Sequence, residues 1–244
     1  MPSSQSFMKI AAMRKGEGHA RIEFYGCQLR CGYCPHNDQE GQNKEVIEVL
    51  EFIADPKVDE VYLGGAEPTI YQKELLETLQ RLTRMNKKVT LKTNGMSPEF
   101  IKETVGLVHH YVIEVKCPFD DPACASDLTG IPKETAEKYL EALHQTLEEL
   151  KGREVSVLIR VIPGFINADS IERIGSQLTG LAKEVVLIQF LSNPENDKPF
   201  MGIKEPQPSE AEMVDMARRM VHHIPKVVVR GQTFSHEFGS SSVS

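Results

Sequence analysis

The stretch Cys27-Gln-Leu-Arg-Cys31-Gly-Tyr33-Cys34 places three cysteines within eight positions of a 244-residue chain. It directly follows His19–Tyr25, a run in which apolar residues are frequent and which we predict to be the first strand. Clustered cysteines in a chain without an export signal are more typical of metal or redox chemistry than of disulfides. The loop after the first predicted strand is therefore the first candidate functional site.

Strands and amphipathic helices are predicted to alternate along the rest of the chain. In the clearest helix, apolar residues such as Ala136, Leu140 and Leu143 recur every three or four positions. The predicted helices are Lys44–Ile53, Glu74–Arg84, one starting at Ser97, Pro132–Lys151, Ser170–Leu181, and one from Ser209 to about His223. The further predicted strands are Val58–Leu63, Lys88–Thr93, His110–Val115, Val155–Ile162, Glu184–Phe190 and Lys226–Arg230.

This alternation predicts βαβ crossovers and a parallel sheet, hence an α/β fold. The pattern suits either an open, partly closed barrel or a doubly wound sheet. In both folds ligands bind at the carboxyl ends of the strands. We expect a single domain over residues 1–244, with a core of about 19–200, a C-terminal helix and strand at 208–231 and a flexible tail at 232–244.

Composition narrows the range of partners. The chain is 40% apolar and carries a net charge of −7, which argues against broad binding to nucleic acid or membrane surfaces. No run of ~18 apolar residues that could span a bilayer occurs. The N-terminus lacks the apolar core of a secretion signal, so we expect a cytoplasmic protein.

The cysteine spacing C-x3-C-x2-C, with Tyr33 before the last cysteine, limits the metal chemistry. Three thiolates on one loop can bind three irons of a [4Fe-4S] cluster and leave the fourth iron open to a small molecule. Structural zinc normally takes four protein ligands. His36 could supply a fourth ligand, so a zinc-binding module without catalysis remains an alternative.

The motif C-x3-C-x-aromatic-C at the end of a first strand resembles the radical S-adenosylmethionine (radical SAM) superfamily. The resemblance implies a partial (β/α)6 barrel with parallel strands, and a [4Fe-4S] cluster bound by Cys27, Cys31 and Cys34. It also implies that the open iron binds S-adenosylmethionine (SAM), whose reductive cleavage gives a 5′-deoxyadenosyl radical that abstracts hydrogen. The resemblance further implies that Tyr33 lies beside the adenine and contacts it mainly through its backbone.

Two further motifs follow the second and third predicted strands. Gly64-Gly65-Ala66-Glu67-Pro68 resembles the family's Gly-Gly-Glu-Pro segment, which implies that Gly65, Ala66 and Glu67 lie around the methionyl group of SAM. Thr93-Asn94-Gly95 resembles the Asp-Thr-Asn-Gly run of glycyl-radical-enzyme activases, such as the pyruvate formate-lyase activating enzyme. Lys92 replaces the aspartate that helps to hold a cation in those enzymes, so we expect that cation to be missing here.

The ends of the fourth and fifth predicted strands complete the pattern. Glu114-Val115-Lys116 resembles the activases' Asp-x-Lys, which implies that Lys116 lies near the cofactor carboxylate. Arg160 is internal to an apolar strand, and a buried arginine is costly unless paired. We expect it to face the barrel lumen and a carboxylate, either Glu114 or the cofactor. The expected cofactor contacts are therefore Tyr33, Gly65, Ala66, Glu67, Asn94, Lys116 and Arg160.

The resemblance is strongest to activases for pyruvate formate-lyase and anaerobic ribonucleotide reductase. It implies hydrogen abstraction from a glycine of a partner enzyme, a flavodoxin- or ferredoxin-like reductant, and an anaerobic setting. The alternative enzyme function is a radical SAM reaction on a small metabolite such as a deazapurine precursor, on a peptide or on tRNA. Cys117 and Cys124 are too few for a second cluster, and we expect them to be a buried pair of thiols.

Overall fold

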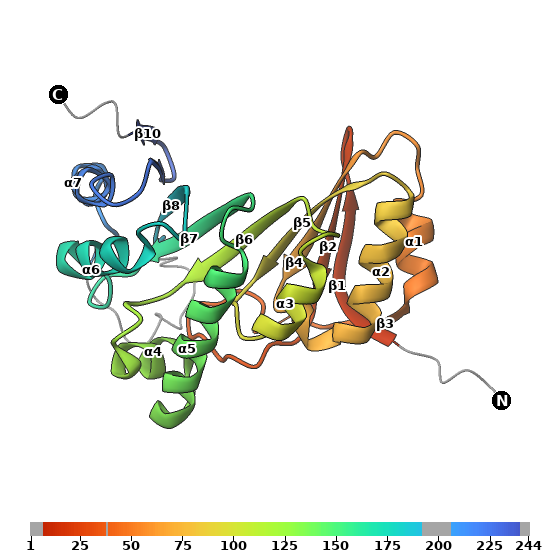
Figure 1. The fold of residues 1–244 in the computed structure, drawn as a ribbon, viewed down its shortest axis with the longest axis horizontal. Helices are drawn as coiled ribbons and strands as arrows, with labels where there is room; N and C mark the ends of the chain where they lie inside the picture. The colour runs from red at the N-terminus through yellow and green to blue at the C-terminus, as the bar shows by residue number, and fades with distance from the viewer. Residues whose placement is uncertain (1–6, 38, 192–205, 240–244) are drawn as a thin grey trace.

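The computed structural model describes residues 7–37, 39–191 and 206–239. These residues form one ten-stranded sheet with the strand order β10-β9-β8-β7-β6-β5-β4-β2-β1-β3 (Figure 1). No helix among them is long and apolar enough to cross a membrane. The sheet is the frame on which the candidate site is built.

The central strands of the sheet pair in parallel and are joined by helices, so the fold is the expected α/β partial barrel. These strands are β2 (His19–Phe24), β4 (Glu60–Gly65), β5 (Lys88–Thr93), β6 (His110–Val115), β7 (Val155–Val161), β8 (Glu184–Gln189) and β9 (Lys226–Arg230). The helices are α1 (Val46–Ile53), η1 (Pro68–Tyr71), α2 (Gln72–Arg84), α3 (Pro98–Thr104), α4 (Pro122–Thr129), α5 (Lys133–Glu149), α6 (Ala168–Leu178) and α7 (Glu210–Met220).

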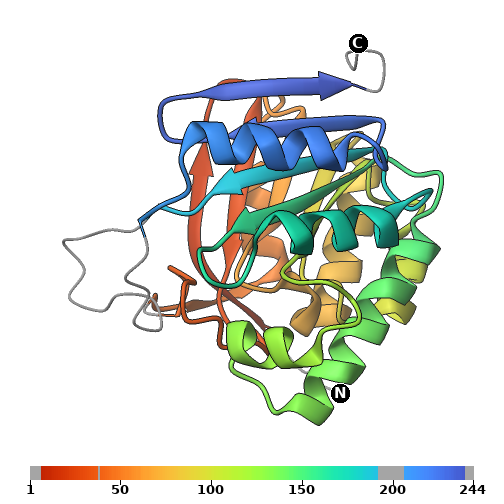
Figure 2. The same cartoon turned by 90° about the vertical axis from the view of Figure 1, so that its left-hand side faces the viewer.

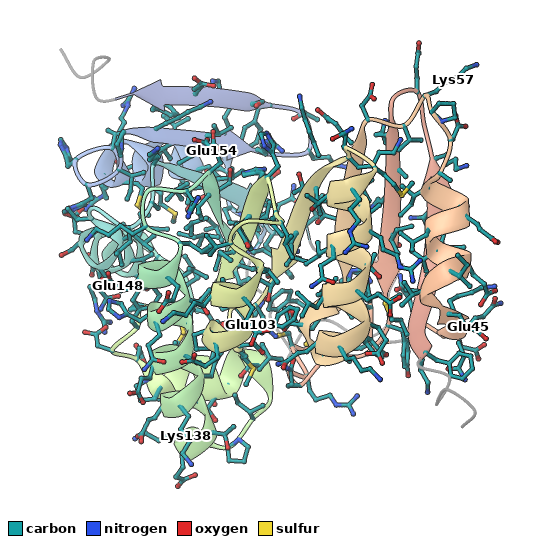
Figure 3. All side chains as sticks on the ribbon, turned by 45° about the vertical axis from the view of Figure 1, so that its right-hand side comes forward. Glu45, Lys57, Glu103, Lys138, Glu148 and Glu154 are labelled. Atoms are coloured by element: carbon teal, nitrogen blue, oxygen red, sulfur yellow. The ribbon has the colours of Figure 1, made fainter. Side chains whose placement is uncertain are left out.

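The hydrophobic core lies between one face of the sheet and the helices that cover it (Figure 2). Helix α5 illustrates why: Tyr139, Leu143 and Leu147 fall on one face and are fully buried, whereas Lys138 and Glu148 on the other face are exposed (Figure 3). Along the strand β6 every second side chain points to the helices, which buries Tyr111, Ile113 and Val115. The alternate residues of the strands, including Glu114, therefore face away from the helices.

Three strands were not predicted, and all of them pair antiparallel at the edges of the sheet. They are β1 (Phe7–Lys15), β3 (Gln42–Glu45) and β10 (Ser235–Gly239). Strand β3 consists of polar residues, and β10 buries none of its side chains fully, so neither carries the alternation that marks a strand. The expectation of a flexible tail from residue 232 is thus wrong for β10.

Helix starts and strand ends agree with the predictions to within a few residues, with two informative outcomes. The capping box of Ser209 and Glu212 is present, since the Ser209 hydroxyl accepts from the Glu212 amide. Ser97 precedes α3 as expected, but its side chain makes no capping bond, and its hydroxyl oxygen instead lies 3.5 Å from that of Thr69. Part of the expected core, residues 192–200, lies outside the described residues.

Candidate functional site

One cavity at the carboxyl ends of the parallel strands brings together all the residues expected at the site. Its walls come from the cysteine loop and from the ends of β4, β5, β6 and β7. It is lined by the expected ligands Cys27, Cys31 and Cys34, and by the expected cofactor contacts Tyr33, Gly65, Ala66, Glu67, Asn94, Lys116 and Arg160. Lys92, Glu114 and His36 also line it.

The cysteine loop is held in place by hydrogen bonds that include one of its own sulfurs. The Leu29 amide donates to Cys27 Sγ at 3.3 Å, and Asn94 Nδ2 donates to the same sulfur at 3.7 Å. Burial raises the pKa of Cys27 to about 11 and also raises the pKa of Cys31, with Lys116 acting in the opposite direction. These thiols are therefore neutral on their own, and a bound metal centre would displace their protons.

The donor set fits an iron–sulfur cluster better than a single metal ion. Among the residues that the structure describes, no group of three or more His, Cys, Asp and Glu side chains could hold one ion. His36 does not join the cysteines, since its Nδ1 lies 2.8 Å from Oε1 of Gln39. Three thiols around a common cavity, one of them already accepting N–H donors, are what a cluster with an open iron needs. The geometry thus gives no support to the zinc alternative.

The Gly64-Gly65 turn packs directly against the start of the cysteine loop. Gly65 has a φ of +92°, and a Cβ there would lie 2.8 Å from the Phe24 nitrogen, so only glycine fits. The Ala66 amide donates to the Phe24 carbonyl at 3.1 Å, and the Glu67 amide donates to the Gly26 carbonyl at 2.9 Å. The positive φ falls on Gly65 and not on the next residue, so alanine at position 66 leaves the turn unstrained.

The carboxylate of Glu67 is fully buried and ties the turn to the end of β5. Its Oε1 accepts from the amide and hydroxyl of Thr69, at 3.1 and 2.7 Å, and from the hydroxyl of Thr93 at 2.8 Å. Its Oε2 accepts from the Asn94 amide at 2.7 Å. Burial raises the pKa of this carboxyl, and these donors act against the rise. Glu67 therefore positions the two loops that line the cavity.

A network of charged side chains around Glu114 also lines the cavity. Oε1 of Glu114 lies 2.9 Å from Nζ of Lys116 and accepts from the Tyr33 hydroxyl at 3.1 Å, while Oε2 lies 3.0 Å from Nζ of Lys92. Lys116 Nζ also donates to the Tyr33 hydroxyl at 2.9 Å. Burial alone would raise the pKa of Glu114, but the two ammonium groups hold it well below its usual range. One carboxylate is thus shared by two cations.

Arg160 is at the site but is not paired with Glu114, one of the two partners that the sequence suggested. We expected Glu114 or the cofactor to face it, yet no ion pair joins Arg160 to Glu114 among the described residues. Its Cζ lies 5.8 Å from the centre of the Tyr33 ring, and its buried Nε has no hydrogen-bond partner. The guanidinium therefore remains available to an anionic ligand in the cavity.

Cys117 and Cys124 are both free thiols, but only one of the expected buried pair is fully buried. Cys117 is fully buried, directly after Lys116, while Cys124 on α4 is half-buried. A hydrogen bond between the two sulfurs, together with burial, raises the pKa of Cys117, and the same bond lowers the pKa of Cys124.

Comparison with known families agrees with this geometry. A model described as the radical SAM superfamily matches residues 23–174. A protein of Methanocaldococcus jannaschii, provisionally described as a glycyl-radical enzyme activating enzyme, is 26% identical over 222 residues, which cover 86% of this chain and 88% of the relative. A 7-carboxy-7-deazaguanine synthase of Methanospirillum hungatei is 32% identical over 130 residues, which cover 48% of this chain and 54% of that enzyme.

Solved structures resemble the fold at low sequence identity. SuiB of Streptococcus suis, solved with bound S-adenosylmethionine, superposes with a TM-score of 0.63 at 15% identity, covering 85% of this chain and 48% of SuiB. At that identity the likeness concerns the fold alone. Fold, donor set and family model thus agree on one kind of cofactor chemistry.

Proposed function

The chain belongs to the radical SAM superfamily, whose members use a [4Fe-4S] cluster and SAM, and on that premise we propose that it activates a partner enzyme by abstracting hydrogen from one of its glycines. When bound, the cluster and SAM supply the 5′-deoxyadenosyl radical that takes the hydrogen atom. The chain's own residues would hold these groups, exclude water and leave room for a peptide loop.

The proposed ligands of the cluster are Cys27, Cys31 and Cys34. The backbone of Gly65 and Ala66 would meet the methionyl group of SAM, in a turn that Glu67 keeps in place through the Thr93 and Asn94 bonds. Asn94, Lys116 and Arg160 would bind the polar groups of SAM, and Tyr33 would lie beside the adenine.

The observation that carries the activase proposal is the end-to-end similarity to the M. jannaschii protein, which spans 86% of this chain and 88% of that relative. Similarity of that extent supports a shared domain layout as well as a shared cofactor motif. Cys27 and Cys34 are half-buried and not fully enclosed, which supports the approach of a partner to the cysteine loop. We further propose a cytoplasmic location, an anaerobic setting and a flavodoxin- or ferredoxin-like electron donor.

A second candidate is a reaction on a small molecule, favoured by the higher identity to the M. hungatei 7-carboxy-7-deazaguanine synthase over 130 residues. Three cations, Lys92, Lys116 and Arg160, line the cavity together with two carboxyl groups, those of Glu67 and Glu114. Such an excess of positive charge suits a substrate that carries a carboxylate.

A label-transfer experiment separates the two candidates. The anaerobically reconstituted protein is reduced with dithionite and incubated with SAM and a peptide that covers a glycine loop of a candidate partner enzyme and is deuterated at the glycine α-carbon. Deuterium in the 5′-deoxyadenosine product supports the activase. Transfer from a deuterated carboxylated deazapurine precursor, with none from the peptide, supports the second candidate. A reduced, cluster-loaded protein that forms no 5′-deoxyadenosine with either compound contradicts both candidates.

A further inference from the structure

The side chain of Asn94 contacts the sulfur of a proposed cluster ligand. Asn94 directly follows β5, has 6% of its surface exposed and lines the cavity together with Cys27. Its Nδ2 donates to Cys27 Sγ at 3.7 Å and to Oε1 of Gln28, on the same loop, at 3.4 Å. The side-chain amide therefore joins the end of β5 to the cysteine loop at the sulfur itself.

The bonds around the Asn94 side chain determine which of its two polar ends meets the sulfur. Its Oδ1 accepts from the backbone amide of Met96 at 3.0 Å. The oxygen of a side-chain amide can only accept and its nitrogen can only donate, so this bond assigns the orientation of the group. The N–H groups are thus the ones that face Cys27.

The backbone that carries this donor is held on both sides. The Asn94 amide donates to the buried carboxylate of Glu67 at 2.7 Å. The Gly95 amide donates to the Thr93 hydroxyl at 3.2 Å, and the Gly95 carbonyl accepts from the Thr146 hydroxyl of α5 at 2.8 Å. These bonds pre-organise the side chain, which needs no rearrangement to keep its N–H groups at the sulfur.

The Cys27 sulfur accepts two N–H donors, since the Leu29 amide also donates to it, at 3.3 Å. A neutral thiol is a weak acceptor. As a ligand of a cluster the same sulfur is a negatively charged thiolate, for which such donors are much better partners. Reduction adds negative charge to the cluster and its sulfurs, so a donor at the sulfur stabilises the reduced form more than the oxidised form.

We propose that Asn94 is a positioning residue whose side-chain amide donates a hydrogen bond to the Cys27 thiolate of the loaded cluster and thereby raises the cluster's reduction potential. The inference rests on the proposed role of Cys27 as a cluster ligand. It adds a second role for Asn94 beside the proposed contact with SAM. The donor sets how readily the cluster accepts the electron on which the cleavage of SAM depends.

The Asn94→Leu variant removes the donor at a similar side-chain volume. We expect a cluster with full iron content whose reduction equilibrium is about tenfold less favourable, which corresponds to about 59 mV for one electron. The measurement is an anaerobic redox titration without SAM, followed by electron paramagnetic resonance. Asn37→Leu is the matched control, because Nδ2 of Asn37 donates to the backbone carbonyl of Cys31 at 2.8 Å and not to a sulfur. Its potential should equal that of the wild type.

A second measurement detects the contact in the wild type itself. Protein that contains asparagine labelled with nitrogen-15 at the side-chain amide should show a nitrogen-15 coupling to the reduced cluster in pulsed resonance spectra. Asn94→Leu should lose this coupling, and Asn37→Leu should keep it. An unchanged potential in a fully loaded Asn94→Leu variant overturns the inference, and so does a wild type without the coupling.

The two measurements also separate the inference from the proposed function. If Asn94→Leu does not hold a cluster, the nitrogen-15 coupling decides alone: its presence in both the wild type and Asn37→Leu supports the contact, and its absence from the wild type overturns it. Failure of the wild type to load iron would instead contradict the proposed function.

Discussion

Nζ of Lys92 on β5 lies 3.0 Å from Oε2 of Glu114 on β6, while Nζ of Lys116 lies 2.9 Å from Oε1 of the same carboxylate. A single carboxylate thus balances two ammonium groups in a buried setting. The surplus charge of this trio is positive, and all three residues line the cavity. The trio should attract the carboxylate of SAM and has no need of an added cation to neutralise Glu114.

The Lys116→Ala variant should weaken SAM binding about 10–150-fold, because a charge-assisted hydrogen bond contributes roughly 1.5–3 kcal/mol. Titration calorimetry on the cluster-loaded protein measures the dissociation constant. Lys102→Ala is the control, since Lys102 is exposed and pairs with Glu149 on the surface. An unchanged dissociation constant in Lys116→Ala would mean that this lysine serves only Glu114 and Tyr33.

The contribution of Glu114 to stability should disappear in acid. Its pKa in the folded protein is held below the unfolded value of about 4.3 by Lys116 and Lys92, in spite of burial. The stabilisation is therefore present above about pH 4.3 and is lost as the pH falls through the lower folded pKa. Urea unfolding of the apoprotein should show the free-energy difference between wild type and Glu114→Gln shrinking from pH 6 toward pH 3. A pH-independent difference would contradict this assignment.

Glu67→Gln should destabilise the protein by about 1–3 kcal/mol, because an amide nitrogen replaces one of the oxygens that accept from Thr69, Thr93 and Asn94. Anaerobic urea unfolding of the apoprotein measures the loss. Glu103→Gln on the exposed face of α3 is the control and should change little. A Glu67→Gln variant as stable as the wild type would mean that the buried carboxyl is protonated in the folded protein.

Cys34→Ala should prevent stable loading of a four-iron cluster, because the expected ligand set has only three thiolates. Iron analysis and the resonance signal of the reduced cluster would show the loss. The Cys124→Ala variant, which removes a thiol outside the cavity walls, should load as the wild type does. Full iron content in Cys34→Ala would remove Cys34 from the ligand set.

Iodoacetamide should modify Cys124 in the cluster-loaded protein and spare Cys117 until the protein unfolds. The hydrogen bond from Cys117 lowers the pKa of Cys124, which is half-buried, whereas Cys117 is fully buried and its own pKa is raised. Peptide mapping by mass spectrometry after timed quenching measures both sites. Equal rates at the two cysteines would show that α4 opens readily in solution.

The sequence predicted the central strands well because these strands bury one face under helices. The bounds of β5, β6 and β9 agree residue for residue with the expected Lys88–Thr93, His110–Val115 and Lys226–Arg230. Strand β1 was missed because a register shift between Ile10 and Ala12 interrupts its alternation. Edge strands depend on backbone pairing more than on side-chain burial, so their sequences carry little signal.

The candidate site, like the fold, could be predicted only in part. Motifs that follow strand ends led to residues that the structure brings to one cavity, because parallel strands end at a common edge. The shared use of Glu114 by Lys92 and Lys116 depends on how β5 and β6 lie next to each other, which spacing along the chain does not encode. Helical periodicity makes Tyr139 a core residue, and only the three-dimensional structure shows that its hydroxyl has no partner.

The Ala66 amide donates to the Phe24 carbonyl and the Glu67 amide donates to the Gly26 carbonyl. These two hydrogen bonds join the turn that is proposed to meet SAM to the start of the cysteine loop. Two segments joined in this way cannot be ordered independently. A cluster that orders the cysteine loop therefore also orders the turn. By thermodynamic reciprocity, bound SAM should stabilise the cluster-loaded form of the loop. The expected consequence is that a loaded cluster and bound SAM each strengthen the binding of the other.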